Sequence, residues 1–281
     1  MAMKYGIALP LSGIDGDIER LVEYAHIAEE AGWDGVFLED YIVYWVKGGV
    51  TYDPWLALTA IALRTKRVRL GMTVTPLPSR LPWKLAREAV TLDHLSHGRL
   101  ILGFGLGDPR DSHFGEVSNV KQRAEMLDEG LEILAGLMSG QPFHYEGQHY
   151  RVEHVTFEPQ PLQKPRIPIW IGGFWPRKAP ARRAAHWDGF CPAKVPDAQG
   201  YGSFQPADVS AIRTFIAQER TDKGPFDLCI GGYSPGDDKA RARAQVGEFE
   251  QAGATWWCEF VLPDLGQAQQ ALTRIKQGPP R

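Results

Sequence analysis

Eight short apolar segments, each followed by an amphipathic segment, constrain the fold of this chain more than any other feature. The apolar segments are apolar on both faces, as strands buried in a parallel sheet are. In the first amphipathic segment Ile18, Leu21 and Ala25 share one face at a period near 3.6 residues, which predicts a helix. The expected strands cover residues 4–9, 34–39, 67–74, 99–104, 167–171, 188–192, 226–232 and 255–261.

Capping residues mark the ends of the expected helices. We expect Asp15 or Asp17 to cap the first helix and Gly32 to end it, and Pro82 suits the first turn of a later one. Eight strand–helix units without a change of composition predict an α/β fold, a single closed (β/α)8 TIM barrel over residues 1–281. The later helices are expected near residues 53–64, 82–97, 120–139, 177–186, 206–220, 238–252 and 265–276.

Residues 141–166 exceed what a minimal barrel needs. They contain YEGQHY followed by the alternating sequence RVEHVTF, a pattern typical of a β-hairpin. We therefore expect a hairpin inserted before the fifth strand.

A doubly wound nucleotide-binding sheet is the rival interpretation, and GFGLGD at residues 103–108 is its best support. The glycines stand at positions 103, 105 and 107, so the spacing of G-x-G-x-x-G is not matched. That motif also requires a helix to begin at once, whereas here the helical pattern begins only near Val120. The barrel is therefore favoured.

Composition and charge narrow the classes of partner. The chain is 43% hydrophobic over 281 residues, enough for a sizeable core, and its net charge of −3 argues against nucleic acid or an anionic membrane as partner. No apolar run reaches the roughly 18 residues of a membrane span. The N-terminus has no signal-peptide core, so we expect a cytoplasmic protein.

The three cysteines, Cys191, Cys229 and Cys258, lie far apart in apolar strand-like segments. No HExxH, CxxC or close histidine–carboxylate cluster accompanies them. We expect buried free thiols in a reducing compartment, with neither disulfides nor a metal site.

The chemistry of such barrels lies at the carboxyl ends of the strands, which we call the barrel mouth. The second strand ends at Glu39, Asp40 and Tyr41, and an aromatic loop follows, whose residues could form either a substrate wall or a dimer surface. Glycine, threonine and aromatic residues at the other strand ends suit a flat ring with polar edges. Because no Ser-His-Asp order or matched carboxylate pair stands out, we expect a cofactor to carry the chemistry.

Six stretches, taken together and in this order, resemble the luciferase-like flavin- or F420-dependent oxidoreductases. They are AEEAGWDGVFLEDY, DPWLALTAIALRTKRVRLGMTVTP, TLDHLSHGRLILGFGLGD, QRAEMLDEGLEIL, FEPQPLQKPRIPIWIGG and HWDGF, and they lie within residues 4–192. The resemblance implies a TIM barrel that holds an isoalloxazine or deazaflavin ring in its mouth. Reduced FMN would serve monooxygenation with O2, and F420 would carry a hydride.

The resemblance also implies roles for particular residues. It places a cis peptide bond at Thr73–Val74, behind the ring. Asp93 and Arg99 lie at the opposite end of the barrel, where residues serve stability, and are expected to form a helix-to-strand structural pair. Two positions depart from the family pattern: Tyr41 stands where a histidine is common, and Leu106 where the true luciferases carry a basic residue. The candidate catalytic residues are Asp40, Tyr41 and His113, and the candidate cofactor-binding residues are Thr73, Val74, Phe104, Gly105, Gly172, Gly173, Phe174 and Trp175.

The stretch IWIGGFWPRKAP is a candidate phosphate site. Gly172 and Gly173 are expected to form a tight turn that exposes backbone amides to the cofactor phosphate, ahead of a helix N-terminus. Arg177 or Lys178 would add a charged contact, unless both are solvated, and the alternative is that the two glycines only make a tight turn.

The predicted function is oxidation or reduction of a small apolar or aromatic organic substrate. A homodimer is expected, with a flavin reductase as a further partner in the FMN interpretation. The alternative from another class is a non-catalytic flavin-binding barrel or partner subunit.

Overall fold

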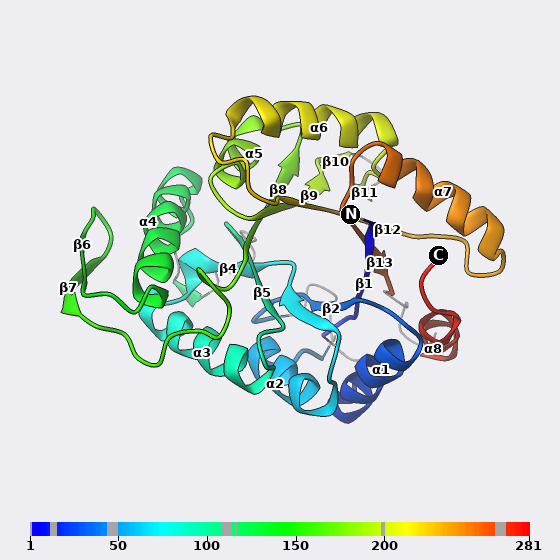
Figure 1. The fold of residues 1–281 in the computed structure, drawn as a ribbon, viewed down its shortest axis with the longest axis horizontal. Coiled ribbons are helices and arrows are strands. Elements are labelled where there is room, and N and C mark those ends of the chain that lie inside the picture. The colour runs from blue at the N-terminus through cyan, green and yellow to red at the C-terminus, as the bar shows by residue number, and fades with distance from the viewer. Residues whose placement is uncertain are drawn as a thin grey trace.

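Eight parallel strands close into a ring surrounded by helices (Figure 1), which confirms the predicted barrel. The computed structural model describes residues 2–11, 16–43, 50–107, 114–115, 117–197, 200–261 and 268–281. All eight expected strands are present within one or a few residues of their predicted bounds. In ring order they are β1 (Lys4–Ala8), β2 (Gly35–Leu38), β3 (Arg69–Met72), β5 (Leu100–Gly105), β8 (Ile169–Trp175), β9 (Gly189–Lys194), β12 (Asp227–Gly232) and β13 (Trp256–Phe260), which pairs again with β1.

The helices follow the strands as predicted, and local capping explains their ends. Asp17 caps the first helix by accepting from the backbone N–H groups of Glu19 and Arg20 at 2.9 and 3.3 Å, while Asp15 lies outside the described residues. Within the described part of the chain, no helix combines the length and apolar character that crossing a membrane requires. The helices are α1 (Ile18–Glu30), α2 (Pro54–Arg64), α3 (Pro82–Leu95), α4 (Val120–Met138), α5 (Lys178–Ala184), α6 (Pro206–Glu219), α7 (Lys239–Gln251) and α8 (Ala268–Gln277).

The expected hairpin is also present. Strands β6 (Phe143–Glu146) and β7 (Arg151–Val155) pair antiparallel and project beside α4 (Figure 1). Glu129 of α4 accepts hydrogen bonds from three backbone N–H groups of the hairpin turn, at residues 148–150. This carboxylate therefore fastens the insertion to the outside of the barrel.

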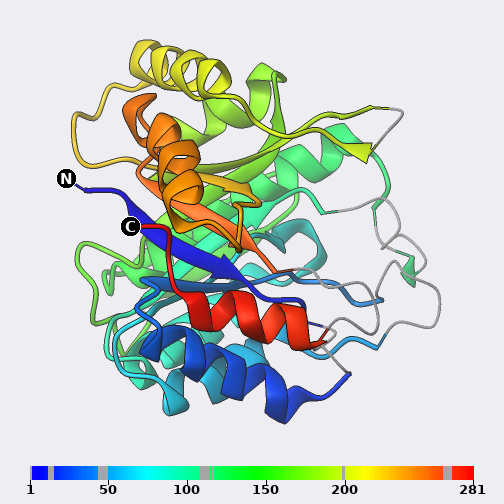
Figure 2. The same ribbon diagram turned by 90° about the vertical axis from the view of Figure 1, so that its right-hand side faces the viewer.

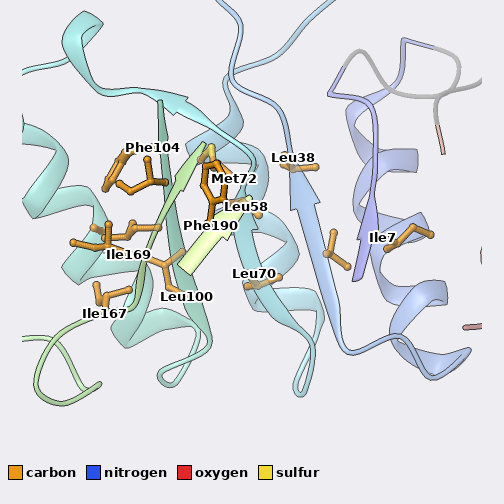
Figure 3. Close-up of a cluster of buried hydrophobic side chains, with 14 of the residues drawn as sticks. Ile7, Leu38, Leu58, Leu70, Met72, Leu100, Phe104, Ile167, Ile169 and Phe190 are labelled. Atoms are coloured by element: carbon orange, nitrogen blue, oxygen red, sulfur yellow. The ribbon is translucent and has the colours of Figure 1, made fainter. Parts of the chain in front are cut away.

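The strands bury two separate apolar layers, because side chains alternate between the two faces of a strand. The outer layer lies between strands and helices and includes Leu38, Met72 and Phe104 (Figure 3). The inner layer fills the lumen of the barrel: the ring of Phe37 lies 5.5 Å from that of Trp170 and 5.7 Å from that of Trp256. Knowing the layer of a residue therefore shows whether its side chain can reach the lumen and the mouth.

Residues at the amino-terminal end of the barrel, where the strands begin, stabilise the fold. Both chain ends lie on the side from which β1 starts (Figure 2), and Arg281 forms an ion pair with Asp34 there. Asp93 and Arg99 do not pair with each other as expected. Asp93 accepts from the backbone N–H groups of Leu162 and Gln163, and Arg99 donates to backbone carbonyls of residues 62–68 and of Ser96. Asp93 therefore stabilises the segment at residues 162–163, and Arg99 stabilises the segment at residues 62–68.

Candidate active site

The exit of the third strand forms the floor of the barrel mouth. The Thr73–Val74 peptide bond is cis, as predicted, and it lies between β3 and the short strand β4 (Thr75–Pro76). The Val74 side chain sits in a notch between β5 and β8. A Cβ on Gly105 would lie 2.7 Å from one Val74 methyl, and a Cβ on Gly172 would lie 2.6 Å from the other. We call Thr73, Val74, Gly105 and Gly172 the mouth floor.

Asp40, a candidate catalytic residue, is engaged in a buried ion pair. It lies one residue beyond β2, and both of its carboxylate oxygens accept from Nη2 of Arg80 at 2.8 Å. Burial raises the pKa of Asp40, while the Arg80 charge and the Thr75 hydroxyl lower it, with a net rise. Sequence reasoning missed Arg80, which follows the 3-10 helix η1 (Leu77–Ser79). The pair ties the end of β2 to the loop that carries the mouth floor.

The side chain of Glu39, the residue before Asp40, lies on the opposite face of the strand from that of Asp40. It stands two residues after Phe37, so strand alternation directs it into the lumen above the inner aromatic layer. The side chain is half-buried, and across the described ranges no residue gives it a hydrogen bond or an ion pair. Burial raises the pKa of Glu39 from its ordinary value of 4.5 to about 7. The sequence indicated its place at the mouth but not this orientation.

Of the other two candidate catalytic residues, Tyr41 and His113, the structure describes only Tyr41. Tyr41 is half-buried at the end of the second strand, two positions beyond Glu39. His113 lies outside the described residues, so its role stays a prediction.

The side chains of two candidate cofactor residues, Phe104 and Trp175, point away from the mouth. Phe104 is fully buried in the outer layer between the barrel and its helices. Trp175 is also in the outer layer, where its ring lies 6.2 Å from that of Phe215 on α6. By the same alternation Phe174 faces the lumen side and is half-buried. Phe174 therefore remains a candidate wall of the cofactor site.

The stretch around Gly172 and Gly173 is part of a strand, so the expected tight turn is wrong. Strand β8 continues to Trp175 and pairs with β9 throughout, with Gly173 opposite Pro192. A Cβ on Gly173 would clash with the ring of Pro180 on α5, so this glycine allows a close approach of helix and strand. Whether either glycine also contacts the cofactor stays a prediction.

The two cations after this strand lie over aromatic rings. The Lys178 ammonium is 3.9 Å from the ring centre of Trp175, on the outer side of the barrel, and the Arg177 guanidinium is 5.6 Å from that of Phe174. Helix α5 has only seven residues and no side-chain cap. Of the two cations, Arg177 is therefore the better placed to reach the mouth.

A buried arginine fixes the segment that directly follows β5. Arg123, in the first turn of α4, donates to the carbonyl of Leu106 at 2.7 Å and to the hydroxyl of Ser79 at 3.1 Å. It also donates to the carbonyl of Val117. Arg123 therefore holds the segments after β4 and β5 together beside the mouth floor.

The three cysteines, scattered in sequence, come together inside the barrel. They lie on adjacent strands and face the lumen, and all three are free, as predicted. Burial raises the pKa of Cys191 to about 12, and a hydrogen bond with Cys258 together with burial raises that of Cys229. Cys191 and Cys229 are therefore protonated thiols at neutral pH and poor nucleophiles. Among the described residues, no group of three or more His, Cys, Asp or Glu side chains is placed to hold a metal ion.

Fold and site together define a barrel whose mouth offers a shaped, uncharged floor, and among the residues that the structure describes there no activated nucleophile is found. A family model described as luciferase-like monooxygenase matches residues 3–278. The chain belongs to this family. The match extends well beyond residues 4–192, to which the sequence resemblance was confined.

Particular relatives and structures agree with this assignment. The chain is 35% identical over 163 residues to an F420-dependent glucose-6-phosphate dehydrogenase of Microbacterium testaceum, a match that covers 56% of this chain and about half of the relative, 47%. An F420-dependent secondary alcohol dehydrogenase in complex with an F420–acetone adduct superposes with a TM-score of 0.80 at 16% identity over 98% of both chains. The oxygenating constituent of 3,6-diketocamphane monooxygenase from Pseudomonas putida, in complex with FMN, gives 0.66 at 20% identity over 83% of this chain and 67% of that one. At these identities the two structures establish the fold.

Proposed function

We propose that this protein binds the deazaflavin ring of F420 against the mouth floor and transfers a hydride between that ring and a small organic alcohol or carbonyl compound. The observation that carries the proposal is the seating of Val74 between Gly105 and Gly172, which leaves an even, uncharged surface facing the mouth. The F420-dependent names of the similar dehydrogenases support this cofactor.

The residues present fit such a ring. Thr73 and Val74 would lie behind it, Phe174 would cover part of it, and the lumen below is filled by Phe37 and Trp170, so water is excluded from beneath. When bound, the cofactor would supply the hydride carrier that the chain itself lacks. The protein would position the ring and substrate and manage the proton that accompanies the hydride.

FMN-dependent monooxygenation is the second candidate function. The FMN-bound neighbour favours it, because the same floor suits an isoalloxazine as well as a deazaflavin. In that case a flavin reductase would be the partner that supplies reduced FMN. A non-catalytic flavin-binding barrel would bind a cofactor without turnover.

We also propose a homodimer. The exposed face of α2 carries Leu56 and Leu63, 74% and 61% exposed and two turns apart, which suits a second copy better than solvent. Sedimentation velocity on the protein and on the Leu56→Lys, Leu63→Lys double variant tests this. A dimer that the variant reduces to a monomer supports the proposal, and a monomeric parent contradicts it.

The experiment that tests the function titrates the purified protein with F420 and separately with FMN, following absorbance and fluorescence. We expect F420 to bind at least about tenfold more tightly, a difference of about 1.4 kcal/mol. Incubation with an alcohol panel should then reduce the bound F420. Preference for FMN with oxygen consumption would favour the monooxygenase, and binding without any turnover would favour the non-catalytic alternative.

A further inference from the structure

Glu39 occupies a position that the binding of a ring alone does not explain. The β2–β3 register pairs Leu38 with Met72, and the Thr73 backbone N–H donates to the Leu38 carbonyl at 2.9 Å. Glu39 is therefore level with Thr73, beside the mouth floor. Its side chain is half-buried on the lumen face, where a ligand in the mouth would meet it.

Among the described residues, none places a compensating charge beside Glu39. Level with Phe37, below Glu39, the strands on either side present Ala8 and Gly71 to the lumen. The inner layer is aromatic, and the raised pKa values of Cys191 and Cys229 keep these two thiols uncharged. Asp40 lies on the opposite face, paired with Arg80. Burial is accordingly the cause that raises the pKa of Glu39 to about 7. At neutral pH this carboxyl is present in both protonation states, so it can give or take a proton.

We propose that Glu39 is the acid–base catalyst of this enzyme and exchanges a proton directly with the oxygen of an alcohol or carbonyl substrate. The inference rests on the proposed hydride-transfer function. In oxidation the Glu39 carboxylate would accept the hydroxyl proton of the alcohol while the carbon-bound hydrogen of the alcohol leaves as hydride, with the bonding pair, for F420 as acceptor. A carbon–oxygen double bond would form, and the two electrons would leave the substrate with the hydride. In reduction Glu39 returns the proton to the oxygen.

This role accounts for the proton that hydride transfer leaves unassigned. Without a base, oxidation would have to expel a proton into an apolar mouth, and without an acid, reduction would leave an alkoxide there. General acid–base catalysis of this kind contributes about 10²–10⁴-fold. A carboxyl group whose pKa lies near the working pH is best suited to serve both directions.

The test replaces Glu39 with glutamine, which keeps size and polarity but cannot titrate. In the parent, we expect the oxidation rate to rise with pH through about 7 and the reduction rate to fall through the same range. Glu39→Gln should lower kcat about 100-fold or more, flatten both profiles, and leave F420 affinity within about twofold. Glu39→Asp should restore part of the rate and the pH dependence. Glu19→Gln, an exposed glutamate on α1, is the matched control and should leave rate and profile unchanged.

A second readout needs no turnover. Infrared difference spectroscopy of the cofactor-free protein should show a protonated carboxyl band that disappears as the pH rises through about 7, absent from Glu39→Gln and present in Glu19→Gln. If the band is still present in Glu39→Gln, the inference is overturned. A Glu39→Gln enzyme with the rate and pH profile of the parent would overturn it as well. Both results leave hydride transfer by the parent standing. A parent that binds F420 but reduces none of it contradicts the proposed function, and the inference with it. If Glu39→Gln does not fold, Glu39→Asp carries the same comparison.

Discussion

Arg80 holds both carboxylate oxygens of Asp40 at 2.8 Å, and the Asp40 side chain is only 2% exposed. This contact joins the end of β2 to the segment after β4, on either side of the mouth floor. It makes Asp40 a residue on which the shape of the mouth depends.

Asp40→Ala should therefore reduce stability as well as turnover. Removing one partner of a buried pair costs about 3–5 kcal/mol, and the partial solvent access of Arg80 places this case at the lower end, about 3 kcal/mol. Thermal unfolding of the cofactor-free variant measures it. A melting temperature equal to the parent's would show that the pair contributes little.

Gly172→Ala should weaken cofactor binding by displacing Val74 from its notch. The new Cβ would lie 2.6 Å from a Val74 methyl, so the valine must move toward the mouth where the ring is proposed to lie. We expect at least about tenfold loss of F420 or FMN affinity, about 1.4 kcal/mol, in a fluorescence titration. Gly247→Ala on α7 is the matched control, because nothing lies within 4 Å of its added Cβ. Equal affinity in both variants would mean that the ring does not rest on the mouth floor.

Gly173→Val should lower the melting temperature. The added side chain would clash with Pro180 and push α5 away from β8. Overpacking of this kind costs about 1–3 kcal/mol. Thermal unfolding without cofactor checks this, and an unshifted melting temperature would show that α5 adjusts freely.

The proposed phosphate contact near Gly173 needs its own measurement. Comparing FMN with riboflavin in the parent shows whether the phosphate adds affinity, and Arg177→Gln tests the cation nearest the lumen side. We expect the phosphate to add affinity that Arg177→Gln diminishes. If the FMN and riboflavin affinities are equal, no phosphate site lies at this end of β8.

Because of Glu39, the free energy of unfolding should depend on pH in the range above 4.5, the ordinary pKa of this side chain. Burial raises its pKa from 4.5 to about 7, so between these values the folded state binds more protons than the unfolded state. Stability therefore falls as pH rises through this window and levels off above about 7. Glu39→Gln should match the parent near pH 4.5 and exceed its stability above pH about 7, as measured by urea unfolding at several pH values. A constant difference between the two proteins across the window would contradict the raised pKa.

Several features could be read from the sequence because short-range chemistry determines them. The alternation of apolar and amphipathic segments predicted the eight strands and their helices, since buried parallel strands and surface helices have different periods. The helix cap was expected at Asp15 or Asp17, and the cis bond in GMTVT was implied by the family resemblance. The hairpin at Phe143–Val155 followed from its turn and its alternation.

Only the tertiary structure decided which side of each strand faces the lumen. Because parallel barrel strands are apolar on both faces, the sequence does not reveal whether Phe37 or Leu38, or Phe174 or Trp175, points inward. Ring closure and strand register settle that choice, and they turn Phe104 and Trp175 outward and Glu39 inward. The same closure brings the three cysteines together, because residues distant in the chain become neighbours only when the strands that carry them are paired.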